Sequence, residues 1–408
     1  MNVRMMACGL VTSLLIAWQV QADSVWAVLE GDPALWPYAD GPNVETVALP
    51  HSVYRMAGVV GVYEGKAAIF SVGGRAQNSY FLDTPGESLE YSGNRQSHFS
   101  IYRRDNGWVS ADGTDDQDNG NGTWTSVGLT GYNNGNGSLS PVVSQGTGYV
   151  ADQGFYFDDA VYVYGGYPQW GGQMARYDIT SNTWSQVALG DDDGLYANGG
   201  GGLIGDQWYK VHREGFLMHY NAATDAFEAD IAITGLINPG FGAVTGVIGD
   251  ALYILDTDGS LYAVDPVNAV QFPKAPAPTA VREAGSVVYE GKLYVLGGKT
   301  DSSNTTAIDR IQIYDPQTDT WVYSSVDMPD ARSGFLSEIL DDTLYIGNGL
   351  NNRPDDQLMV LNDFFSISME AVSTPVPEPC TLAMVCVGLF GVCGLKTRRL
   401  PRGRAHRD

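Results

Sequence analysis

The chain has 408 residues, of which 50 are glycine and 23 are tyrosine, while charged residues make up only 17%. A helical bundle or coiled coil needs Ala, Glu, Lys and Leu in quantity, so this composition argues against both classes. The hydrophobic content of 44% can build a large core, which argues against a disordered chain. The net charge of −24 repels phosphate backbones and therefore disfavours a nucleic-acid partner.

Residues 1–22 have the pattern of a secretory signal peptide. Arg4 gives a positive start, residues 7–16 are largely apolar, and the residues up to Ala22 fit a small-x-small cleavage site. The alternative is an N-terminal core strand. We expect export, with cleavage after Ala22 and a mature chain that starts at residue 23.

Two units in the middle of the chain share one pattern. In each unit, a short strand rich in aromatic and β-branched residues ends in a glycine pair, and a tyrosine later stands seven residues before a tryptophan. The glycine pairs are 165–166 and 297–298, and the aromatic pairs are Tyr177 with Trp184 and Tyr314 with Trp321. Such runs are too short for helices, and turn residues separate each tyrosine from its tryptophan.

This pattern resembles kelch repeats. The resemblance implies an all-β fold, a kelch-type β-propeller with one four-stranded blade per repeat around a central channel. Weaker copies bring the expected number of blades to six; they lie at 69–108, 220–227, 252–266 and 344–361. We expect the paired aromatic side chains to fill the space between blades. The ring would be closed by an outer strand at either 44–50 or 364–369.

The spacing of the glycine pairs leaves a seventh blade open. Gly73 and Gly165 are 92 positions apart, about twice the local repeat, and a segment rich in Asp, Asn and Gly lies at 110–122. We interpret this segment as a loop inserted in a propeller domain of residues 23–373. A calcium site is the alternative, with Asp112, Asp115, Asp116 and Asp118 as weak candidates. The EF-hand spacing fails, because Ser126 stands where a bidentate Glu is needed.

Seven basic residues are expected to gather on one face of the propeller. They are Arg55, Arg75, Arg213, Arg282, Lys299, Arg332 and Arg353. In kelch blades the loop before the first strand and the loop after the second strand open on the same face, and these residues stand in such loops. The family commonly binds ligands there. The alternative is that these side chains pair with carboxylates between blades.

The C-terminal segment, residues 374–408, has three parts in sequence. Val376, Pro377, Glu378 and Pro379 precede an apolar stretch at 380–395, and a basic cluster follows at 396–404. This order resembles the PEP-CTERM sorting signal of Gram-negative bacteria. The resemblance implies transient anchoring in the inner membrane by one apolar helix, cleavage near the motif by an exosortase, and delivery to the cell surface, the extracellular matrix or a biofilm. A plain C-terminal membrane anchor is the alternative.

The exported body offers little for catalysis. All four cysteines lie in the two end segments, so the body has no disulfide, no cysteine zinc site and no cysteine nucleophile. Without residues 1–22 and 380–408, Lys and Arg number 16, Asp and Glu number 46, and the net charge is near −30. We find no catalytic motif and expect no cofactor. We expect a non-enzymatic protein that binds an anionic exopolysaccharide or a surface protein; the alternatives are a glycan-acting enzyme and a structural matrix component.

Overall fold

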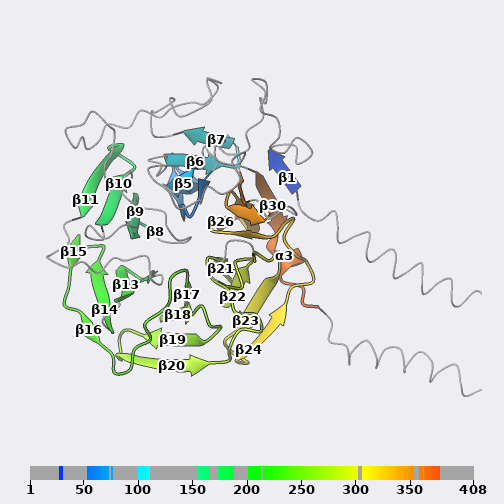
Figure 1. The fold of residues 1–408 in the computed structure, drawn as a ribbon. Helices are drawn as coiled ribbons and strands as arrows, with labels where there is room; N and C mark the ends of the chain where they lie inside the picture. The colour runs from blue at the N-terminus through cyan, green and yellow to red at the C-terminus, as the bar shows by residue number, and fades with distance from the viewer. Residues whose placement is uncertain are drawn as a thin grey trace, which may run out of the picture.

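The computed structural model describes residues 27–30, 53–72, 75–76, 99–105, 107–110, 154–165, 173–187, 201–212, 215–301, 306–352, 358–361 and 363–376. Six antiparallel sheets of four or five strands are arranged as blades in a ring, and two smaller sheets join the loops between strands (Figure 1). The prediction of an all-β, six-bladed kelch-type propeller is therefore confirmed. No helix among these residues is long and apolar enough to cross a membrane. The expected signal peptide and apolar C-terminal helix lie outside them.

The first five blades each run from the inner to the outer strand in chain order. Blade 1 contains β3 (Ala57–Tyr63), β4 (Lys66–Val72), β6 (Phe99–Arg103) and β7 (Gly107–Ser110). Blade 2 contains β8 (Gly154–Phe157), β9 (Ala160–Gly165), β10 (Gln173–Asp178) and β11 (Thr183–Val187). Blade 3 contains β12 (Gly201–Ile204), β13 (Gln207–His212), β14 (Phe216–Asn221) and β15 (Ala226–Phe227), with β16 (Ile231–Ala232) also paired to β14.

Blade 4 contains β17 (Val244–Ile248), β18 (Ala251–Leu255), β19 (Leu261–Asp265) and β20 (Val270–Lys274). Blade 5 contains β21 (Gly285–Tyr289), β22 (Lys292–Leu296), β23 (Ile311–Asp315) and β24 (Thr320–Tyr323).

The local sequence explains the tight hairpin between the first and second strands of a blade. In blade 5, Glu290 and Gly291 turn the chain with φ values of 47° and 72°, the left-handed conformation that two-residue hairpin turns require.

Blade 6 is built from both ends of the domain. Its strands are β26 (Leu336–Leu340), β27 (Thr343–Gly347), β30 (Phe364–Ser368) and, at the outer edge, β1 (Ala27–Glu30). The expectation that 364–369 is the outer closing strand is wrong, because β1 takes the outer position and β30 is the third strand. The other expected closing strand, at 44–50, lies outside the described residues. The segment at 358–361, expected to be part of this blade, instead forms β29 (Leu358–Val360) of a separate small sheet.

No blade separates blades 1 and 2. Their inner strands pack directly: a Cβ on Gly154 of β8 would lie 2.3 Å from Val59 Cγ2 of β3, and a Cβ on Gly61 would lie 2.3 Å from Tyr156 Cδ2. This contact leaves no room for a seventh blade at the place where the spacing allowed one. The insert at 110–122 lies outside the described residues except for Ser110, which ends β7.

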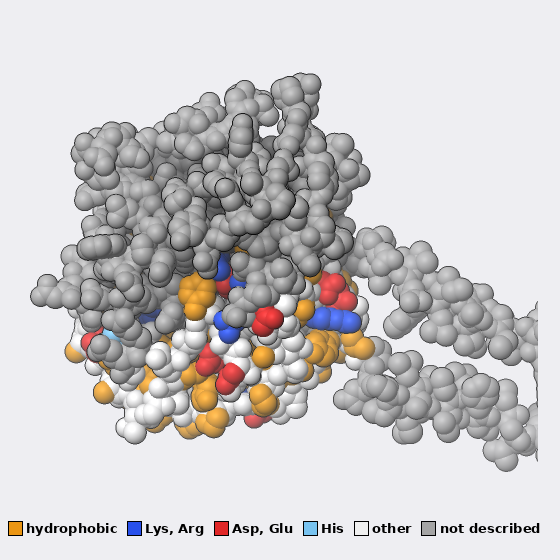
Figure 2. Space-filling view, viewed as in Figure 1, with side chains coloured by type: hydrophobic (Ala, Val, Ile, Leu, Met, Phe, Trp, Pro, Cys, Tyr) orange, Lys and Arg blue, Asp and Glu red, His pale blue; other side chains and the backbone are white. Residues whose placement is uncertain are grey.

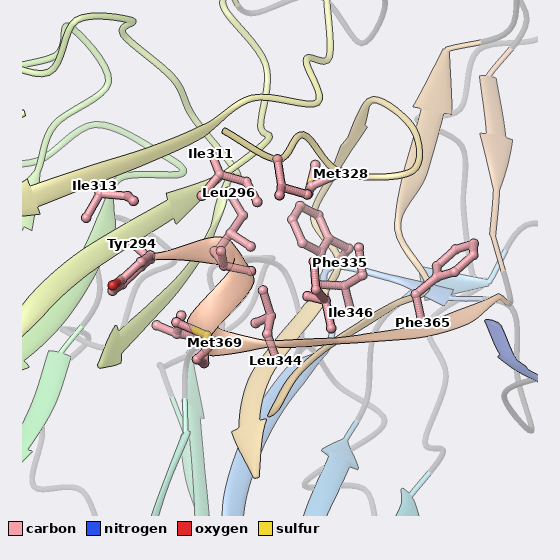
Figure 3. Close-up of a cluster of buried hydrophobic side chains, with 14 residues drawn as sticks. Tyr294, Leu296, Ile311, Ile313, Met328, Phe335, Leu344, Ile346, Phe365 and Met369 are labelled. Atoms are coloured by element: carbon pink, nitrogen blue, oxygen red, sulfur yellow. The ribbon is translucent and has the colours of Figure 1, made fainter. Parts of the chain in front are cut away.

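The expected aromatic pairs stand directly opposite each other across the outer hairpins. Tyr177 pairs with Trp184 and Tyr314 with Trp321 in the strand register. Trp184 is buried as expected, at 4% exposure, but Trp321 is only partly buried. Between blades 5 and 6, side chains such as Leu296, Leu344 and Phe365 fill a common core (Figure 3).

The chain leaves blade 6 and returns to blade 5. The short helix α3 (Met369–Val372) places Met369 and Val372, both 0% exposed, into the core between these blades. Beyond it, Ser325 N donates to Thr374 O at 2.7 Å and Val376 N to Tyr323 O at 3.0 Å. The residues up to Val376 therefore lie along the outer edge of blade 5.

Candidate functional site: the channel mouth

The loops predicted to share one face do meet in the structure. β2 (Val53–Tyr54) pairs with β5 (Arg75–Ala76), and β25 (Arg332–Ser333) pairs with β28 (Leu350–Asn352). In blade 5 the backbones of Arg282 and Lys299 pair in the same way. In each case the residues before the first strand lie beside those after the second strand, so these loops surround one end of the channel.

A chain of backbone hydrogen bonds links four blades at this mouth. Arg55 N donates to Gly334 O at 2.6 Å, Gly334 N to Glu283 O at 2.8 Å, and Glu283 N to Gly242 O at 2.8 Å. Each residue stands two positions before the inner strand of its blade and has a positive φ, between 52° and 84°. We call these four residues the mouth ring. A side chain at Gly242 would be strained by its φ, and its Cβ would lie 2.9 Å from Glu283 N.

The side chain of Arg55 crosses the mouth from blade 1 to blade 5. Its Nε and Nη2 atoms donate to Glu283 Oε2 and Oε1 at 2.8 and 2.7 Å, the bidentate geometry that suits a guanidinium and a carboxylate. Its guanidinium carbon lies 5.2 Å from the ring centroid of Phe241, which precedes blade 4 on the opposite side of the channel. Arg55 thus joins blades that are not neighbours in the ring.

Lys299 holds Glu283 from the other side. Its Nζ lies 2.7 Å from Glu283 Oε1, and both side chains are only 2% exposed, whereas that of Arg55 is 14% exposed. Burial alone would raise the pKa of Glu283, but Arg55 and Lys299 outweigh it and hold this pKa below its ordinary value. Burial lowers the pKa of Lys299, and contact with Glu283 only partly offsets this effect.

Arg282 is the more accessible basic residue of blade 5 at this mouth. Its side chain is partly exposed, and its charge is close enough to Lys299 to disfavour the protonated form of that lysine. In the described part of the mouth, Arg55 and Lys299 both contact Glu283, and Arg282 adds a third basic side chain close to Lys299.

Arg332 has a different role from its expected one. It is 0% exposed, and its five N–H groups are all engaged: with both oxygens of Asp330, both oxygens of Asp363 and the carbonyl of Asn348. Burial would lower the pKa of this guanidinium, but the two aspartates outweigh it and raise the pKa. Arg332 therefore stabilises the loops of blade 6 and is not available to a ligand.

The register explains why these arginines differ. Tyr54, Arg282 and Ser333 pair with the residues just after the second strands, so they are equivalent. Arg55 stands one residue after this position, in the mouth ring, and Arg332 one residue before it.

Several other predicted site residues cannot be placed from the described part of the chain. Arg75 has a described backbone only, and Arg213 and Arg353 lie outside the described residues. The same holds for the expected cleavage, sorting and calcium residues, which are Ala22, Pro377, Glu378, Pro379, Asp112, Asp115, Asp116 and Asp118.

Beneath the mouth ring, the inner strands enclose a channel. A cavity of about 320 Å³ is lined by residues of β3, β8, β12, β17, β21 and β26. Its walls are mostly glycine and aliphatic residues, with Ser286, Thr245 and Glu338 as polar lining groups. No cluster of three or more potential metal-ligating His, Cys, Asp or Glu residues occurs in the described part of the chain.

Comparison with known proteins agrees with this architecture. A model of the Kelch motif matches residues 280–325, which contain all four strands of blade 5. The solved structure of YjhT is similar with a TM-score of 0.52 and 11% sequence identity, covering 78% of this chain and 95% of that chain. At that identity the likeness shows the fold alone. The chain carries a kelch motif within a six-bladed propeller.

Three curated proteins are similar over parts of the chain. Kelch-like protein terF of Aspergillus terreus is 30% identical over 169 residues, which is 36% of this chain and 36% of terF. Kelch-like protein 35 of Mus musculus is 29% identical over 136 residues, 33% of this chain and 22% of that protein. Spermatocyte protein spe-26 of Caenorhabditis elegans is 28% identical over 99 residues, 22% of this chain and 17% of spe-26. The chain thus matches about a third or less of each relative's length.

Proposed function

We propose that this chain is an exported binding protein of a bacterial cell surface or extracellular matrix, sorted by an exosortase, that engages an anionic polysaccharide at the channel mouth. The observation that carries the binding part is that three basic residues lie at one mouth of an otherwise acidic protein: Arg55 and Arg282, which are partly exposed, and Lys299, which is buried against Glu283. The export part rests on the sequence of the two end segments. We propose a binding role rather than an enzymatic one, and no cofactor enters it.

The distribution of charge gives the mouth a preference for anionic ligands. A body with a net charge near −30 repels polyanions in general, so a local group of cations gives an anion a place where it can approach. Guanidinium groups bind carboxylates through two parallel hydrogen bonds, so the contact has a defined geometry in addition to the attraction between charges. Exposed charges are screened over about 8–10 Å at physiological salt, so binding should weaken as salt rises.

Binding is tested with the mature protein and the exopolysaccharide purified from the same organism, at two salt concentrations. The variant Arg75→Ala with Arg282→Ala should bind more weakly, and the difference should shrink at high salt. The matched control is Lys292→Ala with Lys66→Ala, because both lysines follow the first hairpin turns at the other end of the channel. Unchanged binding by the mouth variant would favour a structural matrix component.

Export is tested by mass spectrometry of the surface and medium fractions. We expect a chain that starts near Asp23 and lacks the residues beyond about Pro379. A mature surface protein that still contains Arg398 and Arg399 would exclude processing at the motif.

A further inference from the structure

We propose that Arg55 is a latch: its ion pair with Glu283 closes the channel mouth, and a carboxylate on a sugar ring opens it by replacing Glu283 on the guanidinium. This inference rests on the proposed function, because the same mouth receives the ligand. It adds the group that makes the contact and the chemistry of the residue that is bound, a uronate.

The position of Arg55 is the first reason. Among the four residues of the mouth ring, Gly242 and Gly334 are glycines, whereas Arg55 and Glu283 carry side chains in the same left-handed conformation, at φ values of 59° and 52°. Non-glycine residues in this region are strained, and such strain concentrates at ligand clamps and switches. Here the two strained residues are the two that meet across the channel.

The second reason is that the latch can open without stranding a buried charge. A buried carboxylate that loses its only cation is strongly destabilised. Glu283 keeps Lys299, with Nζ 2.7 Å from Oε1, when Arg55 moves away. Arg55 is also the more accessible of the two cations, with 14% of its side chain exposed against 2% for Lys299. Lys299 is therefore the fixed partner and Arg55 the exchangeable one.

The third reason is the exchange itself. A ligand carboxylate offers the two oxygens that Glu283 now offers, so Nε and Nη2 of Arg55 would keep both hydrogen bonds. Phe241, partly exposed and 5.2 Å from the guanidinium carbon, supplies an aromatic surface beside the bound carboxylate. The apolar face of a sugar ring can pack on such a surface, which favours a uronate over an acidic peptide.

The test measures binding of a galacturonate hexamer to the full-length exported protein by calorimetry at low salt, with the fully methyl-esterified hexamer as the neutral control. Arg55→Gln should weaken binding at least about tenfold, because the bidentate partner is lost. Glu283→Gln should strengthen binding by about threefold or more, because it removes the competing carboxylate. Arg282→Gln changes net charge by the same amount as Arg55→Gln and should weaken binding only about two- to threefold.

Opposite effects of the two substitutions are the signature of a latch, since a purely structural ion pair would lose binding in both variants. If Glu283→Gln does not fold, the latch can still be tested on the wild-type protein by NMR. In protein labelled with ¹⁵N-arginine, the Nε–H signal that Arg55→Lys removes should shift on addition of the hexamer. An unchanged signal at saturation would overturn the latch.

The outcomes separate the two proposals. If the wild type binds the hexamer and Arg282→Gln weakens binding, while Arg55→Gln and Glu283→Gln bind as the wild type does, the latch is wrong and the basic mouth stands. Polyglutamate, an acidic peptide, is measured in the same assay. If the wild type binds neither the hexamer nor polyglutamate, both proposals fail. If it binds polyglutamate but not the hexamer, the assignment of a uronate is wrong.

Discussion

The hydroxyl of Tyr314 donates a 2.7 Å hydrogen bond to Oδ1 of Asp319, the residue that turns the outer hairpin of blade 5 with a φ of 52°. The same contact recurs in two other blades. Tyr177 donates to Asn182 at 2.7 Å, and Tyr220 donates to Asp225. In each blade the tyrosine therefore packs on the aromatic residue opposite it and also holds the left-handed turn between them.

The first prediction concerns this contact. Tyr314→Phe should lower the free energy of unfolding by about 1 kcal/mol, the usual value of one hydrogen bond, because the ring still packs on Trp321. Tyr262→Phe in β19 is the control, because no hydrogen bond of its hydroxyl occurs within the described part of blade 4. Urea denaturation of both variants measures the difference. Equal stabilities of the two variants would contradict a stabilising role for the turn contact.

The second prediction separates the two tryptophans. Trp184→Ala should cost about 3–5 kcal/mol, as other buried large aromatic residues do. Trp321→Ala should cost less, about 1–3 kcal/mol, because Trp321 is only partly buried and its Nε1 donates to the Ala275 carbonyl at 2.8 Å. The measurement is chemical denaturation under identical conditions. A loss below about 1 kcal/mol for Trp184→Ala would contradict its place in the core.

The third prediction is a pH dependence. Lys210, in β13, is buried with its Nζ 5.7 Å from the ring centroid of Tyr164, and burial lowers its pKa to about 7 from an ordinary value of 10.5. Between these pH values the unfolded chain binds a proton that the folded chain does not. The free energy of unfolding should therefore rise with pH across this window, by at most about 1.4 kcal/mol per pH unit from this group.

The comparison for this prediction is Lys210→Met. Unfolding free energies of the wild type and the variant at pH 7.5 and 9.5 should differ in slope, with the steeper rise in the wild type. Parallel pH curves for the two proteins would show that Lys210 keeps its proton in the folded state.

The fourth prediction concerns Arg332. Arg332→Met should lower the free energy of unfolding by about 3–5 kcal/mol, because it leaves the carboxylate of Asp363, which is 4% exposed, without its cation. Arg282→Met, with the same change in charge at a partly exposed site, should change it by less than about 0.5 kcal/mol. Thermal and urea denaturation of both variants provide the measurement. Similar stabilities would contradict the structural role of Arg332.

The repeat architecture could be predicted because its signals are local. The seven-residue spacing from Tyr177 to Trp184 and from Tyr314 to Trp321 is long enough for two strand positions and a turn, and the strand register places each pair opposite. The closing strand could not be predicted, because β1 is four residues long and its partner β30 is more than 300 positions away. Nothing in Ala27–Glu30 itself indicates that pairing.

The candidate site was predicted only in outline. The sequence placed Arg55, Arg282 and Arg332 before first strands, but a shift of one residue decides whether an arginine crosses the channel, remains accessible or becomes buried. Glu283 was missed altogether, although it follows Arg282 directly. Its role depends on Arg55, 228 positions earlier, and such a contact has no sequence signal.

The pairing of β1 with β30 also sets an order of events during folding. Ala27–Glu30 is among the first parts of the domain to be synthesised, and Phe364–Ser368 is among the last. Long-range pairing of this kind forms late, because the entropy of closing the intervening loop must be overcome first. The five other blades need no partner from the far end of the chain. A chain that ends before residue 364 would therefore have no partner strand for Ala27–Glu30, and the ring of blades would not close.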